Sequence, residues 1–228
     1  GYSVSLNTDG TRVGIGSYFA GGGNRGKAQV FEYSEGSWVQ LGEDLLGEAK
    51  GDRSGCSVSI SSDGSRIAVG ALNNSDNGPK SGHARIYEYT DGAWTQVGED
   101  IDGEAAGDWS GDIVSLNADG SRIAIGAFAN SGNGSYSGHT RIYEFSGSHW
   151  VQMGADIDGE AKGDQSGRAI SLSSDGTRVA IGATGNGDNG VWAGHARIFD
   201  YVDGEWIQVG ADIDGVGEND MNGRSISL

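Results

Sequence analysis

Acidic side chains recur at alternate positions in two nine-residue stretches of this sequence. Carboxylates fill positions 1, 3, 5 and 9 of each stretch, and the eight residues are Asp100, Asp102, Glu104, Asp108, Asp156, Asp158, Glu160 and Asp164. Calcium prefers several hard oxygen ligands, which alternate carboxylates on a curled loop can direct toward one point. The pattern therefore predicts calcium as a cofactor. The same aspartates can instead cap turns by accepting hydrogen bonds from backbone N–H groups, and the spacing leaves both interpretations open.

A histidine recurs every 56 residues, at His83, His139 and His195, with Lys27 at the corresponding earlier position. No second histidine stands near any of them, whereas a zinc site needs three or four converging ligands. We therefore expect a structural or solvated role for these side chains.

An arginine and a tryptophan recur with nearly the same period. The arginines are Arg12, Arg66, Arg122 and Arg178. We expect them to pair with acidic or carbonyl groups between units, with anion binding as the alternative. The tryptophans are Trp38, Trp94, Trp150 and Trp206. We expect each to be packed, with one hydrogen-bond partner for its indole N–H.

Variation between the copies indicates a second kind of site. A loop rich in glycine and asparagine varies most, and Lys80, Tyr136 and Trp192 occupy equivalent places in it. Binding residues tend to lie on loops carried by a rigid scaffold, and exposed aromatic side chains often anchor interfaces. These three residues are candidate ligand or partner contacts. Asn73 and Asn133 begin glycosylation sequons in the same loop, which apply only in a eukaryotic secretory route.

No set of residues predicts catalysis. The sequence contains no nucleophile elbow, no Cys/His pair and no His-Glu metal helix. We therefore expect that the protein is not an enzyme.

These candidate residues lie in an internal repeat. Closely similar octapeptides, Asp-Gly-Thr-Arg-Val-Gly-Ile-Gly in the first copy, begin at residues 9, 63, 119 and 175, which are 54, 56 and 56 residues apart. Repeat units therefore cover residues 1–54, 55–110, 111–166 and 167–222, and residues 223–228 begin a fifth copy.

Each unit has the pattern of four short strands. In the second unit, alternating apolar residues predict strands over 57–60, 66–70, 84–89 and 94–97, joined in part by Asp-Gly turns. No stretch has a sustained helical period of apolar residues, so no helix is expected. Four strands in a repeat of about 56 residues predict an all-β fold, a β-propeller of four-stranded antiparallel blades, with four blades and the first strand of a fifth.

Two dipeptides recur at fixed places in the units. Ser-Gly precedes the first strand at 54–55, 110–111 and 166–167, and Gly-Ala follows the second at 70–71, 126–127 and 182–183. In this the unit resembles the FG-GAP repeat of integrin-α-like propellers, which has an aromatic-Gly pair at the first place and Gly-Ala-Pro at the second. The array is also similar to those of large secreted or surface repeat proteins of marine microbes and microalgae. The resemblance implies propeller blades, and the family's calcium loops have a spacing similar to that of the acidic stretches.

Composition narrows the choice of partners. A net charge of -17 and a pI near 4.4 argue against nucleic acid, whose binding depends on clustered Lys and Arg. No apolar run approaches the ~20 residues of a membrane span, so membrane insertion is not expected. The acidic surface suits saline surroundings, and we expect an extracellular or cell-surface location. Cys56 is the only cysteine, which excludes an intrachain disulfide.

Repeat arrays expose adhesive faces and strand edges unless a neighbour covers them. The leading hypothesis is therefore a non-catalytic structural or adhesive module of a longer surface protein or filament. Its partners would be further blades of its own polypeptide or neighbouring copies. The alternative is a lectin-like or calcium-dependent propeller that binds glycans.

Overall fold

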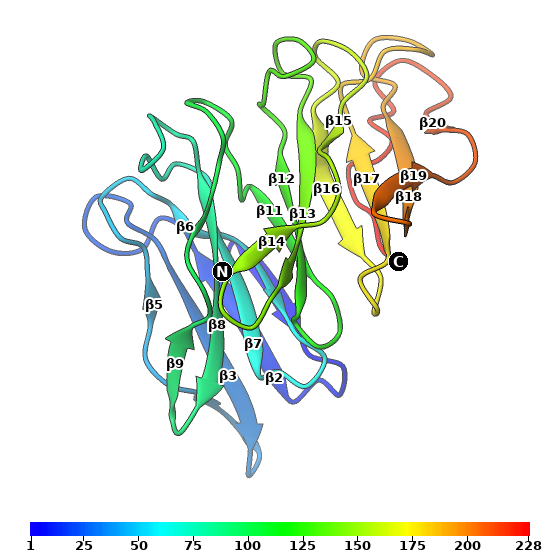
Figure 1. Cartoon of the computed structure of the whole chain (residues 1–228). Helices are drawn as coiled ribbons and strands as arrows, with labels where there is room; N and C mark the ends of the chain where they lie inside the picture. The colour runs from blue at the N-terminus through cyan, green and yellow to red at the C-terminus, as the bar shows by residue number, and fades with distance from the viewer.

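The computed structural model describes residues 1–228 and contains strands, turns and loops but no helix, as expected. It therefore has no helix that could cross a membrane. Four antiparallel sheets follow one another along the chain and lie side by side in sequence order (Figure 1). The predicted β-propeller architecture is confirmed, and we call the four sheets blades 1 to 4.

Every blade consists of four main strands and a short fifth strand. Blade 1 contains β1 (Ser3–Leu6), β2 (Arg12–Ser17), β3 (Lys27–Ser34), β4 (Ser37–Gln40) and β5 (Leu45–Leu46). Blade 2 contains β6 (Ser54–Ile60), β7 (Arg66–Ala71), β8 (His83–Thr90), β9 (Ala93–Gln96) and β10 (Ile101–Asp102). Blade 3 contains β11 (Ile113–Leu116), β12 (Arg122–Ala127), β13 (His139–Phe145), β14 (Trp150–Gln152) and β15 (Ile157–Asp158). Blade 4 contains β16 (Ser166–Leu172), β17 (Arg178–Ala183), β18 (His195–Val202), β19 (Glu205–Gln208) and β20 (Ile213–Asp214).

The short fifth strand was not predicted from the sequence. Each lies at the start of an acidic connector and pairs with the third strand of its own blade, beyond the end of the fourth. In blade 2, this pairing sets Ile101 opposite Ala84 and Asp102 opposite His83. The connector is therefore fastened to the sheet at the point where its carboxylates begin.

Tight turns join the main strands where the sequence predicts them. Asp91 and Gly92 have φ values of 54° and 87°, the left-handed backbone of a type I′ hairpin turn. Between β6 and β7, Oδ1 of Asp63 accepts a 2.9 Å hydrogen bond from the backbone N–H of Ser65. Both turns close locally, which explains why sequence alone places them.

Apolar side chains are buried between blades rather than inside one. The junction of blades 3 and 4 holds a cluster of nine buried residues: Ala124, Ile142, Met153, Ile157, Ile170, Leu172, Val179, Ile181 and Phe199. Similar clusters fill the other two junctions. A single blade leaves these faces exposed to water, so each blade depends on its neighbour for stability.

The two recurrent dipeptides meet at these junctions. A Cβ atom on Gly70 would clash with the backbone carbonyl of Gly111 in the following blade. Next to this contact, the backbone N–H of Val114 donates a 3.0 Å hydrogen bond to Oγ of Ser57. Small residues are therefore required where the inner strands of consecutive blades approach each other.

Residues 223–228 form no regular strand but lie beside β16. The backbone N–H of Leu228 donates a 2.9 Å hydrogen bond to Oγ of Ser171, as Leu172 does to Ser115 at 3.0 Å. This segment therefore occupies the place of a first strand of a fifth blade.

Candidate functional site

The structure divides the carboxylates of each acidic stretch between two blades. Asp100 and Asp102 lie beside His83 of their own blade, with Oδ2 of Asp100 at 3.3 Å and Oδ1 of Asp102 at 4.0 Å from its Nδ1 atom. Oε2 of Glu104 instead lies 3.8 Å from Nδ1 of His139 in the following blade. The loop does not curl around one point, because β10 holds its first residues to the sheet.

The second stretch is divided in the same way. Oδ2 of Asp156 lies 3.4 Å from Nδ1 of His139, and Oε2 of Glu160 lies 3.8 Å from Nδ1 of His195. Asp158 pairs with His139 in the strand ladder. The contact with His139 holds the pKa of Asp156 below its ordinary value. Calcium binding by either loop stays a prediction.

The last aspartate of each stretch caps a turn. Oδ2 of Asp108 accepts hydrogen bonds from the backbone N–H of Ala105 at 2.9 Å and from Nδ2 of Asn130 in the next blade at 3.2 Å. Oδ2 of Asp164 accepts one from the N–H of Ala161 at 2.8 Å. Turn capping is thus confirmed for these two residues.

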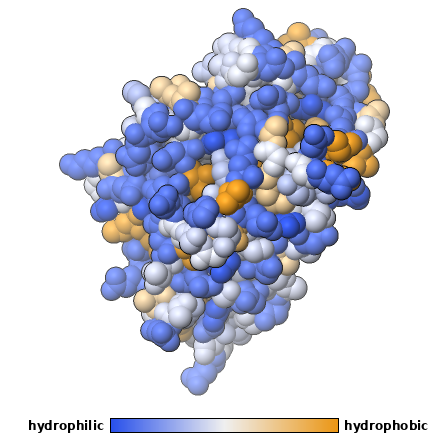
Figure 2. Space-filling view, viewed as in Figure 1, coloured by the Kyte–Doolittle hydropathy of each residue, from blue (hydrophilic) through white to orange (hydrophobic).

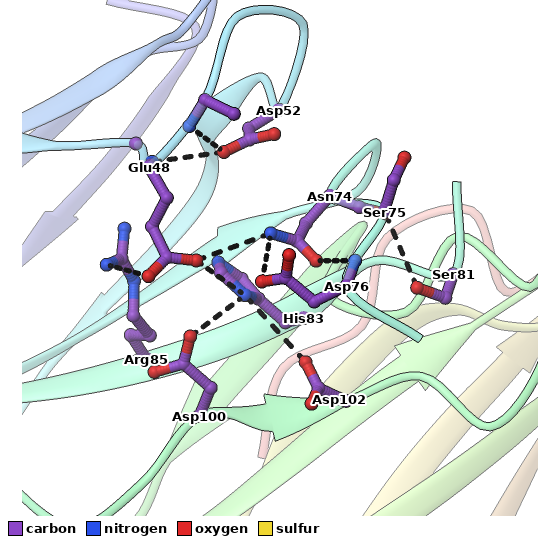
Figure 3. A network of polar contacts seen from close by, with 12 residues as sticks. Glu48, Asp52, Asn74, Ser75, Asp76, Ser81, His83, Arg85, Asp100 and Asp102 are labelled. Atoms are coloured by element: carbon purple, nitrogen blue, oxygen red, sulfur yellow. Dashed lines mark hydrogen bonds and ion pairs between the residues drawn. The ribbon is translucent and has the colours of Figure 1, made fainter. Parts of the chain in front are cut away.

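The recurrent histidines are buried and are not solvated. His83, His139 and His195 expose at most 1% of their side chains. Each faces carboxylates that come from both sides of a blade junction, as Figure 3 shows for the first junction. The sequence did not reveal this convergence, because the glutamate beside each histidine belongs to the preceding repeat unit.

All four recurrent arginines pair with an acid of their own blade, and three of them also bond to a carbonyl of the next blade, as predicted for contacts between units. Nε of Arg66 lies 2.9 Å from Oε1 of Glu88 in its own blade, and its Nη1 donates a 3.2 Å hydrogen bond to the carbonyl of Gly120 in the next. These contacts link consecutive blades.

The three variable-loop residues share one backbone conformation. Lys80, Tyr136 and Trp192 have φ values of 58°, 59° and 59°, and the two aromatic side chains are exposed. Lys80 places its Nζ 5.9 Å from the centre of the Trp109 ring. The left-handed backbone turns the three side chains outward from equivalent loops.

The two sequon asparagines differ in accessibility. Nδ2 of Asn133, the atom that would carry a glycan, donates hydrogen bonds to the carbonyls of Gly159 at 2.9 Å and Glu160 at 3.0 Å. Asn73 is half-buried and has no such side-chain bond. Glycosylation stays a prediction at both.

A groove of about 750 Å³ lies where the first strands of the blades converge. Trp109, Phe128, Arg168 and Trp192 are among its lining residues. The guanidinium carbon of Arg168 lies 4.1 Å from the centre of the Phe128 ring, and Nη1 lies 3.5 Å from Oδ2 of Asp112. Burial raises the pKa of Asp112. The groove offers aromatic surface beside a cation.

Positions that vary between the repeats meet in this groove. One such set is Cys56, Asp112, Arg168 and Arg224, which occupy the same place in successive units and all line it. This site was not predicted from the sequence, although comparison of successive repeats at this position carries the signal.

The outer faces of the first and last blades carry exposed apolar side chains. Val4 and Leu6 are 62% and 58% exposed, whereas their equivalents Val58 and Ile60 are both 7% exposed. On blade 4, Ile213 is 53% exposed and its equivalents in the two preceding blades only 5%. Figure 2 shows a mostly hydrophilic surface with separate apolar patches, one of them over blade 4.

Comparison with known proteins supports the class of fold. Residues 47–87 match the family model of the FG-GAP repeat, which confirms the resemblance. The chain is therefore a β-propeller array in which residues 47–87 match the FG-GAP repeat. A search of curated protein sequences gives no match.

Solved structures share the fold at low sequence identity. A putative 6-phosphogluconolactonase from Bacteroides fragilis has a TM-score of 0.62 at 13% identity, over 96% of this chain and 55% of that one. Kuenenia stuttgartiensis hydrazine synthase has a TM-score of 0.57 at 12% identity, over 91% and 53%. A putative 6-phosphogluconolactonase from Bacteroides uniformis has a TM-score of 0.52 at 12% identity, over 93% and 71%. This chain thus spans little more than half the length of the first two, and the likeness concerns the fold alone.

Proposed function

We propose that this chain is a non-catalytic structural or adhesive module of an extracellular or cell-surface protein, acting through the stacking of its end blades on further blades. The observation that carries the proposal is the exposure of apolar side chains at positions that every internal junction buries or half-buries. We define the leading face as Val4, Leu6 and Trp38 on blade 1. The trailing face is Val209 and Ile213 on blade 4.

The leading face and the trailing face are complementary, because every internal junction consists of one face of each kind. At each junction the trailing face of one blade covers the leading face of the next. Burial of one exposed valine or leucine contributes about 1.5–3 kcal/mol. Contact between leading and trailing faces is head-to-tail, which produces a ring or a filament.

The chemistry of the chain also favours this role. The net charge of -17 keeps the surrounding surface hydrated, so association is confined to the apolar faces. The only thiol, Cys56, is buried, and burial raises its pKa to about 12, which removes the one cysteine as a nucleophile.

Sedimentation of the purified chain over a range of concentrations tests the proposal. We expect association of the wild type, and loss of association in Leu6→Asp and in Ile213→Asp. A mixture of the two variants should form a pair and nothing larger, because each retains one intact face. Val151→Asp is the matched control, since this residue is exposed on an internal blade. A compact monomer at every concentration would refute the proposed association. The proposed location is tested separately, by surface labelling of intact source cells.

A second candidate function is glycan recognition in the groove. The observation that favours it is the convergence of variable positions there, with Trp109 and Trp192 beside Arg168. Aromatic faces can cover the apolar face of a sugar, while a guanidinium donates to its hydroxyls. A glycan array should then report binding that Trp192→Ala abolishes. Tyr136→Ala is the control, because it alters the equivalent loop outside the groove-lining set; equal effects of both changes would argue against the groove.

A further inference from the structure

We propose that the clusters of glutamate, histidine and aspartate at the three blade junctions bind divalent transition-metal ions, with zinc as the representative ion. The junction clusters are Glu48, Asp76, His83 and Asp100 at the first junction, Glu104, His139 and Asp156 at the second, and Glu160, His195 and Asp212 at the third. Within each cluster the candidate ligand atoms all lie within 4.8 Å of one another. Imidazole nitrogen together with carboxylate oxygen suits zinc and its neighbours better than calcium, which takes oxygen alone.

The histidines carry buried polar atoms that the protein does not satisfy. His83 and His195 are 0% exposed, and neither Nδ1 nor Nε2 of either ring has a hydrogen-bond partner. A buried polar atom without a partner costs free energy, so such atoms are rare unless something else binds them. In Figure 3 the His83 ring points into the space between Glu48, Asp100 and Asp102. The unsatisfied nitrogen is therefore directed at the acidic groups.

The separations fit a small ion. Nδ1 of His83 lies 3.3 Å from Oδ2 of Asp100 and 3.8 Å from Oε2 of Glu48. Ligands about 2.0–2.2 Å from a tetrahedral zinc ion are separated by roughly 3.3–3.6 Å. The third junction repeats the arrangement, with Nδ1 of His195 at 3.5 Å from Asp212 and 3.8 Å from Glu160. Small side-chain adjustments would bring these atoms to coordinating distance.

The charge around each cluster favours a cation. Four carboxylates surround His83, and two guanidinium groups lie beside them. Nη1 of Arg85 lies 3.5 Å from Oε1 of Glu48, and Nη2 of Arg141 donates a 2.7 Å hydrogen bond to the backbone carbonyl of Asp102. Four negative and two positive formal charges leave a local charge of -2. Nδ2 of Asn74 donates hydrogen bonds to two of the carboxylates, to Glu48 at 3.4 Å and to Asp76 at 3.1 Å. Such outer contacts orient metal ligands in proteins.

Blade 1 offers an internal comparison. Lys27 occupies the position of the histidines, and its Nζ lies 2.7 Å from Oδ2 of Asp44, the equivalent of Asp100. The ammonium group supplies a positive charge beside this aspartate. In the blade that lacks the histidine, the lysine ammonium group therefore supplies the positive charge beside the aspartate.

The test measures metal content of the untagged chain after chelation and reloading with zinc. We expect three zinc ions per chain by elemental analysis, a higher melting temperature with zinc, and a visible absorption band when cobalt replaces zinc. His139→Lys should lower the content from three ions to two and keep the fold, because lysine occupies this position in blade 1. Glu104→Gln should also remove one ion. The fold should be retained, because the Glu104 side chain is half-exposed. His149→Ala is the control, because this exposed histidine lies outside the clusters.

Three results would overturn the proposal. The first is zinc content below one ion per chain. The second is zinc content unchanged by both His139→Lys and Glu104→Gln. The third is stabilisation by calcium but not by zinc. Any of them would leave the histidines as buried structural residues instead of metal ligands.

Discussion

The indole Nε1–H of Trp150 donates a 2.8 Å hydrogen bond to the backbone carbonyl of Val97 in the preceding blade. Trp94 and Trp206 make the same bond across the other two junctions, each at 2.7 Å. Trp38, in blade 1, makes no such bond and is 47% exposed. Each of these three indole N–H groups has one hydrogen-bond partner, as expected from the sequence, and the bond links two blades.

Trp150→Phe should destabilise the protein by about 0.5–1.5 kcal/mol, because the half-buried Val97 loses the donor to its carbonyl. Trp38→Phe is the matched control and should change the free energy of unfolding by less than about 0.5 kcal/mol. Urea denaturation measures both. Equal losses would mean that ring volume, and not the bond between blades, determines the effect.

Gly70→Ala should destabilise the junction of blades 2 and 3, because the added methyl group meets the carbonyl of Gly111. Overpacking of this kind costs about 1–3 kcal/mol. Gly22→Ala is the control, since a Cβ atom there meets no atom and the backbone is unstrained. Thermal unfolding should separate the two variants, and an unchanged melting temperature for Gly70→Ala would show that the blades can move apart at no cost.

Asp175 should contribute to stability in a pH-dependent way. Hydrogen bonds from Ser173 and Thr177 lower the pKa of Asp175 to about 2, from an ordinary value of about 3.9. Because the folded pKa lies below the unfolded one, its contribution is present above about pH 4 and is lost as the pH falls toward 2. The stability difference between wild type and Asp175→Asn should therefore shrink from pH 5 to pH 2. A constant difference would contradict the assigned hydrogen bonds.

Cys56 should be inert in the folded protein. Its thiol lies 3.3 Å from the carbonyl of Gly70 and 3.2 Å from that of Gly111, and burial raises its pKa to about 12. A thiol reagent at mildly alkaline pH should react slowly with the native chain and rapidly in denaturing urea. Rapid reaction of the native chain would mean that the groove opens beside β6.

Much of the fold could be predicted from local patterns. The strand expected over 66–70 is β7 (Arg66–Ala71), and the turn at Asp91-Gly92 has the expected left-handed backbone. Alternation of apolar residues and Asp-Gly turns act over a few residues, so the sequence displays them directly. β10 (Ile101–Asp102) could not be found this way, because two residues have no period and pair only where β8 extends beyond β9.

The candidate sites depended on contacts between distant residues. From the sequence alone, the carboxylates of one connector were a single group and His83 stood apart. In the structure, His83 meets Glu48 from 35 residues before it and Asp100 from 17 residues after it, across a blade junction. The sequence by itself determined the blades, because repeats and turns are local. The packing of one blade on the next decided which side chains converge, since that convergence depends on distances between units that no spacing within a unit contains.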